Sequence, residues 1–167
     1  DYSTDETGHG TDFFETYLKN LSLTFPCGRD YYAAWPFLQY LTENPDDLAG
    51  YGTGFVKTML QEGQVDEYPF DMVERLADAD IKDTLGHFAK HMAGLDFENG
   101  NAYRARLNEL LSAGSWNWQQ IYTMLEPVAG QSNTYNVPTE RAPQYAGMNI
   151  IPLNVTDSTI SATLNPL

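Results

Sequence analysis

The sequence has few of the residues that carry metal or covalent chemistry. One cysteine, Cys27, and three histidines occur in 167 residues. A single thiol can form neither an intrachain disulfide nor a cysteine-based metal cluster, so we expect Cys27 to be a structural thiol. The chain also contains no GxSxG nucleophile elbow and no HExxH zinc motif. We therefore expect no complete active site within this chain.

Basic residues are also scarce. Nine lysines and arginines stand against 23 aspartates and glutamates, which gives a formal net charge of −14. A surface with this charge repels the phosphates of nucleic acids, and it also disfavours docking on anionic lipid. We expect no nucleic-acid partner.

Long hydrophobic runs are absent from the sequence. No apolar run approaches the roughly 20 residues that a helix needs to cross a bilayer, so we expect no membrane span. The chain begins at Asp1, without a methionine and without a segment that looks like a signal peptide. Together with the acidity and the many tyrosines, this start predicts a processed part of a longer exported precursor, secreted or at the cell surface. A chain trimmed for expression would look the same.

Apolar residues are plentiful, and they recur with helical spacing through the first two thirds of the chain. Hydrophobic residues make up 42% of the sequence, with 11 Tyr, 8 Phe and 3 Trp, which argues against disorder. Residues 1–10 are polar and typical of a linker, and a short helix can begin at Thr11. Pro36 predicts that regular helix begins near Trp35 or kinks there. The segments with a 3.6-residue period are Tyr31–Leu41, Phe55–Leu60, Phe70–Leu76, Ile81–Met92 and Tyr103–Leu111.

The character of the sequence changes after Gly114. A short β-prone run at 121–125, stopped by a proline, precedes a loop over 129–143 that is rich in Gly, Ser, Asn and Pro. The segments 149–155 and 159–164 then predict two strands. In the second of them, apolar and polar residues alternate cleanly.

The expected fold is therefore α+β. We predict a linker at 1–10, a helical lobe over 11–113 and a small antiparallel β portion over 116–167. Two or three strands make a poor independent sheet. We expect them to complete a sheet supplied by another part of the precursor, or to cover the helical lobe.

Aromatic residues gather between Tyr31 and Tyr40, where five occur within ten residues. Tyrosine and tryptophan can stack on sugars or peptides while their polar tips form hydrogen bonds. The spacing of Tyr31, Trp35 and Leu38 is that of a core face of the helix. Tyr32 and Tyr40 fall off that face, so they are the candidates for binding a ligand such as a glycan.

Two of the three histidines, His87 and His91, lie four residues apart in a predicted helix. Asp80 and Asp83 share their flank of that helix. Histidines at i and i+4 can bind one zinc ion, and Asp83 could add a third ligand, which makes these three residues the metal candidates. Phe88, however, stands where HExxH has its glutamate. A solvated polar flank with a weak Asp–His pair is the alternative.

Three stretches resemble segments of a family of secreted bacterial metallopeptidase-like proteins, the Svx-like, zincin-related family, of mostly undetermined function. They are LSLTFPCGRDYYAAWPFLQYLTEN (21–44), HFAKHMAGLDFENG (87–100) and APQYAGMNIIPLNV with ISATL (142–164). Their order matches the family, although Leu95 stands where a tryptophan is expected. The resemblance implies that a zinc-binding HExxH helix would lie upstream of this chain. We therefore expect no cofactor in this chain, and zinc only in that missing part.

The resemblance implies that the chain is the non-catalytic C-terminal portion of an exported metallopeptidase-like surface protein. It would supply packing and one wall of a cleft, and any enzyme that included it would be a zinc metallopeptidase-like hydrolase. Its partner would be the remainder of its precursor or a second chain. The alternative is an extracellular structural or adhesive module that self-associates or pairs strands with a partner, because an incomplete sheet exposes edges that bind other strands.

Overall fold

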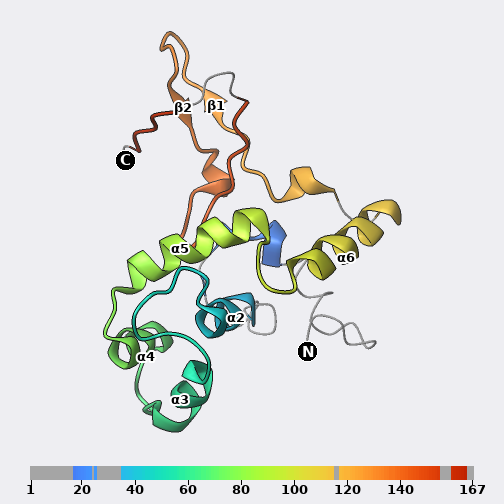
Figure 1. Cartoon of the computed structure of the whole chain (residues 1–167). Helices are drawn as coiled ribbons and strands as arrows, with labels where there is room; N and C mark the ends of the chain where they lie inside the picture. Colours follow the sequence, from blue (N-terminus) through green and yellow to red (C-terminus); the bar gives the residue numbers. More distant parts are fainter. Residues whose placement is uncertain (1–16, 24, 26–34, 115–116, 155–158, 165–167) are drawn as a thin grey trace.

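The computed structural model describes residues 17–23, 25, 35–114, 117–154 and 159–164. Figure 1 shows helices gathered in a lobe and an extended arm that rises from it. The predicted α+β class, with helices followed by a small antiparallel sheet, is confirmed. Among the described helices, none combines the length and the apolar composition needed to cross a membrane.

The described helices follow the predicted periodic segments. Pro36 lies in the first turn of the first of them, where its missing N–H costs no helical hydrogen bond. Residues 17–19 are also helical, whereas the predicted linker at 1–10 and the predicted helix start at Thr11 lie outside the described residues. The bounds are α2 (Trp35–Glu43), α3 (Phe55–Glu62), α4 (Pro69–Ala77), α5 (Ile81–Gly94) and α6 (Gly100–Ser112).

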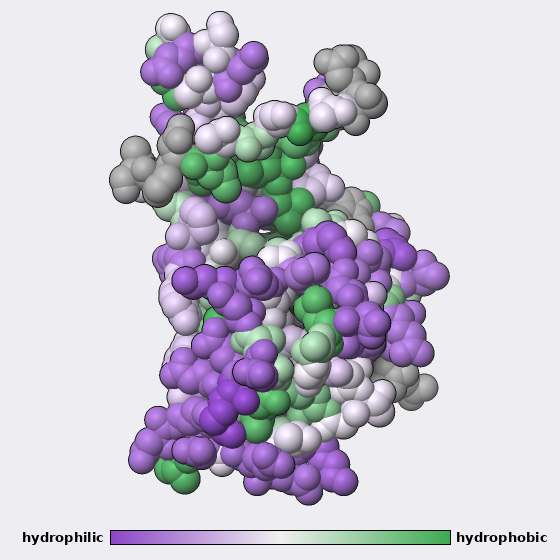
Figure 2. Space-filling model, turned by 60° about the vertical axis from the view of Figure 1, so that its left-hand side comes forward, coloured by the Kyte–Doolittle hydropathy of each residue, from purple (hydrophilic) through white to green (hydrophobic). Residues whose placement is uncertain are grey.

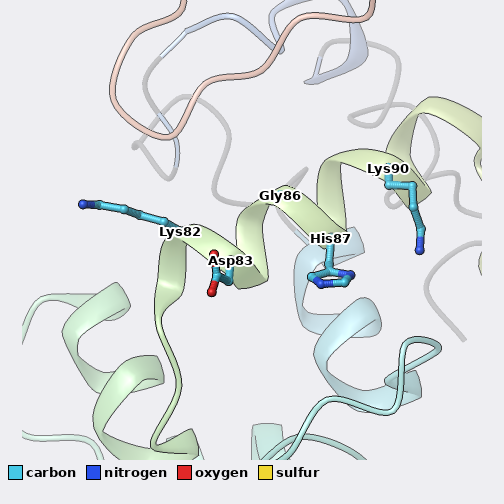
Figure 3. Close-up of a pocket in the computed structure, with 5 residues that line it drawn as sticks. All are labelled: Lys82, Asp83, Gly86, His87 and Lys90. Atoms are coloured by element: carbon cyan, nitrogen blue, oxygen red, sulfur yellow. The ribbon is translucent and has the colours of Figure 1, made fainter. Parts of the chain in front are cut away.

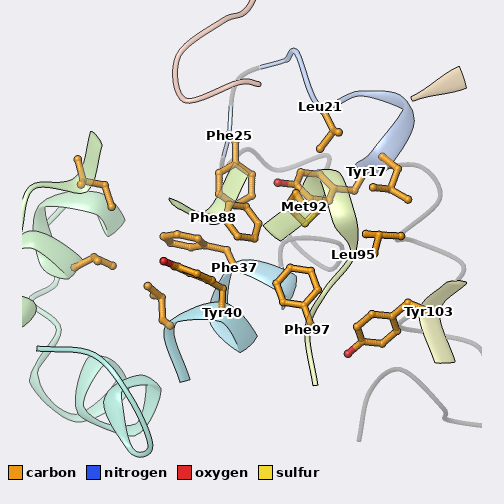
Figure 4. Packing of buried hydrophobic residues seen from close by; sticks show 14 of the residues in the cluster. Tyr17, Leu21, Phe25, Phe37, Tyr40, Phe88, Met92, Leu95, Phe97 and Tyr103 are labelled. Atoms are coloured by element: carbon orange, nitrogen blue, oxygen red, sulfur yellow. The ribbon is translucent and has the colours of Figure 1, made fainter. Parts of the chain in front are cut away.

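An aromatic cluster joins α2 to α5 in the core of the lobe (Figure 4). Phe88 of α5 is fully buried, and its ring centroid lies 5.1 Å from that of Phe37 and 5.7 Å from that of Tyr40. Phe25 adds a third ring at 6.4 Å. Aromatic pairs at these separations stabilise a core beyond the area that they bury.

The buried face of α2 differs from the predicted one. Leu38, predicted for the core, is 37% exposed, whereas Tyr40, predicted to lie off the core face, is 1% exposed. The helix turns Phe37, Tyr40 and Leu41 toward α5. These positions at i, i+3 and i+4 also form one helical face, so the period alone did not decide which face is buried.

The arm is fastened to the lobe by close main-chain contacts around Gly147. The backbone N–H groups of Gln144 and Met148 donate to the carbonyl oxygens of Ser22 and Leu21, each at 2.8 Å. A Cβ at Gly147 would lie 2.4 Å from the Ser22 carbonyl oxygen. Only glycine lets the two chain segments come this close.

The strands are not where the sequence predicted them. β1 (Glu126–Pro127) pairs antiparallel with β2 (Tyr135–Asn136), and β2 lies inside the predicted loop at 129–143. Pro127, predicted to stop a strand, belongs to β1. Proline has no N–H to donate to a ladder, but it is tolerated here because β1 is a two-residue edge strand. In the predicted run at 121–125, only Tyr122 takes part in pairing, as an isolated parallel bridge with Ile150.

The two predicted C-terminal strands are also wrong as far as the structure describes them. Outside the bridge at Ile150, the described residues of 149–155 and 159–164 form no strand. Alternating side chains specify the two faces of a strand, but a strand forms only where a partner supplies the other half of the hydrogen-bond ladder. That partner is absent from the described residues around 159–164.

Candidate functional site

The polar flank predicted on α5 becomes part of a larger cluster once the chain folds. The side chain of Asp80 caps α5 by accepting a hydrogen bond from the Lys82 backbone N–H at 2.7 Å. The helix then continues as far as Gly94, so His87 and His91 lie one turn apart on the same side. Both rings face the loop that follows α2.

Asp46, in that loop, is the centre of the cluster. Its Oδ2 atom lies 3.1 Å from Nδ1 of His87 and 2.9 Å from Nε2 of His91. Its Oδ1 atom accepts from Nζ of Lys90 at 2.5 Å. The hydroxyl of Tyr40 donates to Oδ2 at 3.2 Å. We call Tyr40, Asp46, His87, Lys90, His91 and Asp96 the Asp46 cluster.

His91 is held between two carboxylates. Its Nε2 faces Asp46, and its Nδ1 lies 2.7 Å from Oδ1 of Asp96. The residue is 6% exposed, and its ring packs on that of Tyr40 with centroids 5.5 Å apart. Each ring nitrogen thus faces one carboxylate, and His91 links the loop to the end of α5.

The cluster changes the acidity of its members. The hydrogen bond from Lys90 lowers the pKa of Asp46 well below its usual value, and the bonds from His91 and Tyr40 act in the same direction against the effect of burial. Burial raises the pKa of the Tyr40 hydroxyl, and the nearby Asp46 charge raises it further. Asp46 thus stays charged and Tyr40 stays neutral over a wide pH range.

The metal candidates are only partly brought together. His87 and His91 meet at Asp46, but Asp83 has no hydrogen bond or ion pair with either histidine. Over the described part of the chain, no group of three or more His, Cys, Asp or Glu side chains is arranged to hold a metal ion. A cation in this place would also meet the ammonium group of Lys90.

Asp83 instead lines a shallow pocket on the exposed side of α5 (Figure 3). The pocket has a volume of about 380 Å³ and is lined by Lys82, Asp83, Gly86, His87 and Lys90. The predicted solvated flank describes Asp83, which is exposed. It does not describe His91, whose burial contradicts it.

The predicted ligand-binding tyrosines have different outcomes. Tyr32 lies outside the described residues. Tyr40 is buried, and its hydroxyl is used by Asp46. Ligand binding by either tyrosine stays a prediction.

Sequence reasoning missed Asp46, Lys90 and Asp96. Asp46 is separated from His91 by 45 residues, and no periodic pattern links a loop residue to a helix that distance away. The local signal was the Asn44-Pro45-Asp46-Asp47 turn, which marks the end of α2 and a sharp change of direction. Asn44 and Asp47 both have positive φ, of 47° and 53°. That turn aims the Asp46 carboxylate back at α5.

The depressed pKa of Asp46 predicts a stability loss in acid. The folded state holds the carboxylate charged to lower pH than the unfolded chain does, so this contribution is present above about pH 4 and is lost as the pH falls further. Urea unfolding from pH 7 to pH 3 should show it. Below about pH 4, Asp46→Asn should reduce the slope of unfolding free energy against pH by up to about 1.4 kcal/mol per unit, and between about pH 5 and pH 7 it should leave the slope unchanged. If Asp46→Asn left the slope in acid unchanged, the loss of stability there would not come from protonation of Asp46.

Comparison with known proteins yields a family and no characterised relative. Residues 2–165 match the family described as a family of unknown function, DUF6055. No curated protein and no solved structure matches the chain. The match covers nearly the whole sequence, including the lobe, the Asp46 cluster and the arm. The chain therefore belongs to the DUF6055 family of unknown function.

Proposed function

We propose that this chain is a non-catalytic packing portion of an exported metallopeptidase-like surface protein. The observation that carries the non-catalytic role is how the Asp46 cluster uses its polar atoms. Asp46 accepts from Tyr40, Lys90 and His91, and both ring nitrogens of His91 are occupied by carboxylates. A general base or a metal ligand needs a lone pair directed at a substrate or an ion. Here the groups bind one another.

The cluster also has the position expected of a structural clamp. It ties the loop after α2 to the last two turns of α5 and to the turn that contains Asp96. His91 and Asp46 have side chains that are 8% and 13% exposed, so the link is shielded from water. Shielded charge pairs fix the register of the elements that carry them when every partner is satisfied. The clamp would hold the lobe rigid as a packing surface for the rest of the protein.

A combined zinc and peptidase assay tests the non-catalytic role. We expect the purified chain to contain less than stoichiometric zinc and to hydrolyse no peptide library or denatured protein above the buffer rate, with or without added zinc. Stoichiometric zinc together with turnover that disappears in His91→Gln would overturn the proposal. Asp83→Asn serves as the matched control, because Asp83 lies on the same helix outside the cluster.

The metallopeptidase-like origin has a separate test in the gene. We expect the coding sequence upstream of Asp1 to encode an HExxH helix in the same reading frame. The three stretches with the family's order support this expectation. An upstream sequence without that motif would remove the metallopeptidase-like part of the proposal and leave the packing role standing.

A further inference from the structure

The last described residues of the arm have the alternating sequence of a strand, but they are exposed to solvent and not paired with another described segment. Residues 159–164 alternate apolar and polar side chains, and all six are exposed. In the described part of the chain, none of them takes part in a backbone hydrogen bond. Ile160 is 48% exposed and Leu164 is 85% exposed. Figure 1 shows this segment running sideways from β2 to the C-terminus, apart from the helical lobe.

Hydrophobic surface continues along the arm next to this segment. Figure 2 shows it gathered in the upper part of the molecule, above a lobe whose surface on this side is largely hydrophilic. The large hydrophobic side chains exposed on the arm include Met124, Tyr135, Leu153, Ile160 and Leu164. Exposed apolar side chains beside an unpaired strand-like segment are the usual composition of a surface that binds another chain.

Charge favours a second copy of this chain as the occupant. After Ser112 the charged residues are Glu126, Glu140, Arg141 and Asp157, so the remaining 55 residues carry −2 of the total of −14. Two copies repel each other wherever their lobes meet, because like-charged surfaces raise the free energy of contact. The arm is where two copies can meet with the least repulsion. A basic partner would be attracted to the lobe instead.

The segment also matches itself in a symmetric register that pairs its two large apolar side chains. In an antiparallel pair centred on Ala162, Ile160 of one copy lies opposite Leu164 of the other, and Ser161 lies opposite Thr163. The apolar face then stays continuous across both strands, and the hydroxyl side chains form the other face. A pairing of this kind has two-fold symmetry and closes at a dimer.

We infer that the chain forms a dimer through antiparallel pairing of residues 160–164 about Ala162, with the apolar side chains of the arm packed across the two copies. A five-residue pair alone buries little area compared with a stable interface. The dimer is therefore concentration-dependent. Added salt strengthens it, because screening reduces the repulsion between the lobes.

Sedimentation equilibrium of the full chain over a wide concentration range tests this pairing. We expect the mass to rise from 18.8 kDa toward about twice that value, and to rise at lower protein concentration in 0.3 M than in about 0.02 M salt. A mass that stays at the monomer value at every concentration would overturn the inference. If added salt weakened the dimer, this would indicate that ion pairs hold the two copies together. The arm would then not be the contact.

Two variants and one matched control locate the contact. Leu164→Asp should return the mass to that of the monomer, whereas Leu60→Asp should leave dimerisation unchanged, because Leu60 is equally exposed, at 84%, but lies on α3. A variant with both Ser161→Pro and Ala162→Pro keeps the apolar side chains at 160 and 164. It removes a ladder donor in either case, because the N–H groups of neighbouring residues point to opposite edges of a strand, so it should also give a monomer. A dimer that survives this double change would show that strand pairing is wrong. Unchanged helical circular dichroism checks the fold of each variant.

Discussion

Replacement of Asp46 by asparagine should lower the free energy of unfolding by about 3 kcal/mol. The carboxylate accepts hydrogen bonds from Tyr40, Lys90 and His91, and it lies 3.1 Å from His87. An amide offers one acceptor oxygen, and its NH₂ group would face donors. The buried ring of His91 and the ammonium group of Lys90 would then lose their carboxylate partner in the loop.

Urea unfolding followed by circular dichroism measures this loss at pH 7. Asp47→Asn is the matched control, because Asp47 is the next residue, is exposed, and already has the positive φ that asparagine tolerates well. We expect that control to change stability by less than about 0.5 kcal/mol. Equal stability of Asp46→Asn and wild type would show that the cluster is not a clamp.

Truncation of Phe88 to alanine should cost about 4 kcal/mol. Phe88 has no exposed surface, and its ring contacts the rings of Phe37 and Tyr40 on α2 as well as that of Phe25. The change removes a large apolar group and leaves a cavity at the junction of α2 and α5. A domain has about 5–15 kcal/mol of stability in total, so the loss would be between about a quarter and four fifths of it.

Thermal unfolding by calorimetry checks this result. Phe88→Leu keeps most of the volume and should cost only about 1–1.5 kcal/mol. Leu60→Ala is the surface control, with an expected change below about 0.5 kcal/mol because Leu60 is 84% exposed. A Phe88→Ala protein that melted with the wild type would mean that α2 and α5 do not share a core.

The helices were predictable from the sequence because their signals are local. Apolar spacing located α3, α4 and α5, and the Asn44-Pro45 pair located the end of α2. The buried face of α2 was harder, because Leu38 and Tyr40 each belong to a plausible apolar face. Packing against Phe88 on α5 selects the face with Tyr40, and that contact lies far away in sequence.

The strands and the candidate site could not be predicted from the sequence for the same reason. Both depend on partners that are distant in sequence. The alternation at 159–164 predicted a strand, but the described chain gives it no hydrogen-bond ladder. His87 and His91 were found from their helical spacing, whereas their common partner Asp46 comes from a loop 45 residues before His91. Asp83 was predicted because it shares a flank of the helix with both histidines, whereas the fold directs the histidines at Asp46.

The hydrogen bond between Asp46 and His91 closes a loop that contains all of α3 and α4. The entropy lost in closing such a loop grows only slowly with its length, so one shielded link can restrain the whole excursion. Core contacts, such as that of the Phe70 ring with the Phe37 ring, hold the same stretch of chain. Loss of the link would therefore lower the free energy needed to open α3 and α4 without releasing them outright.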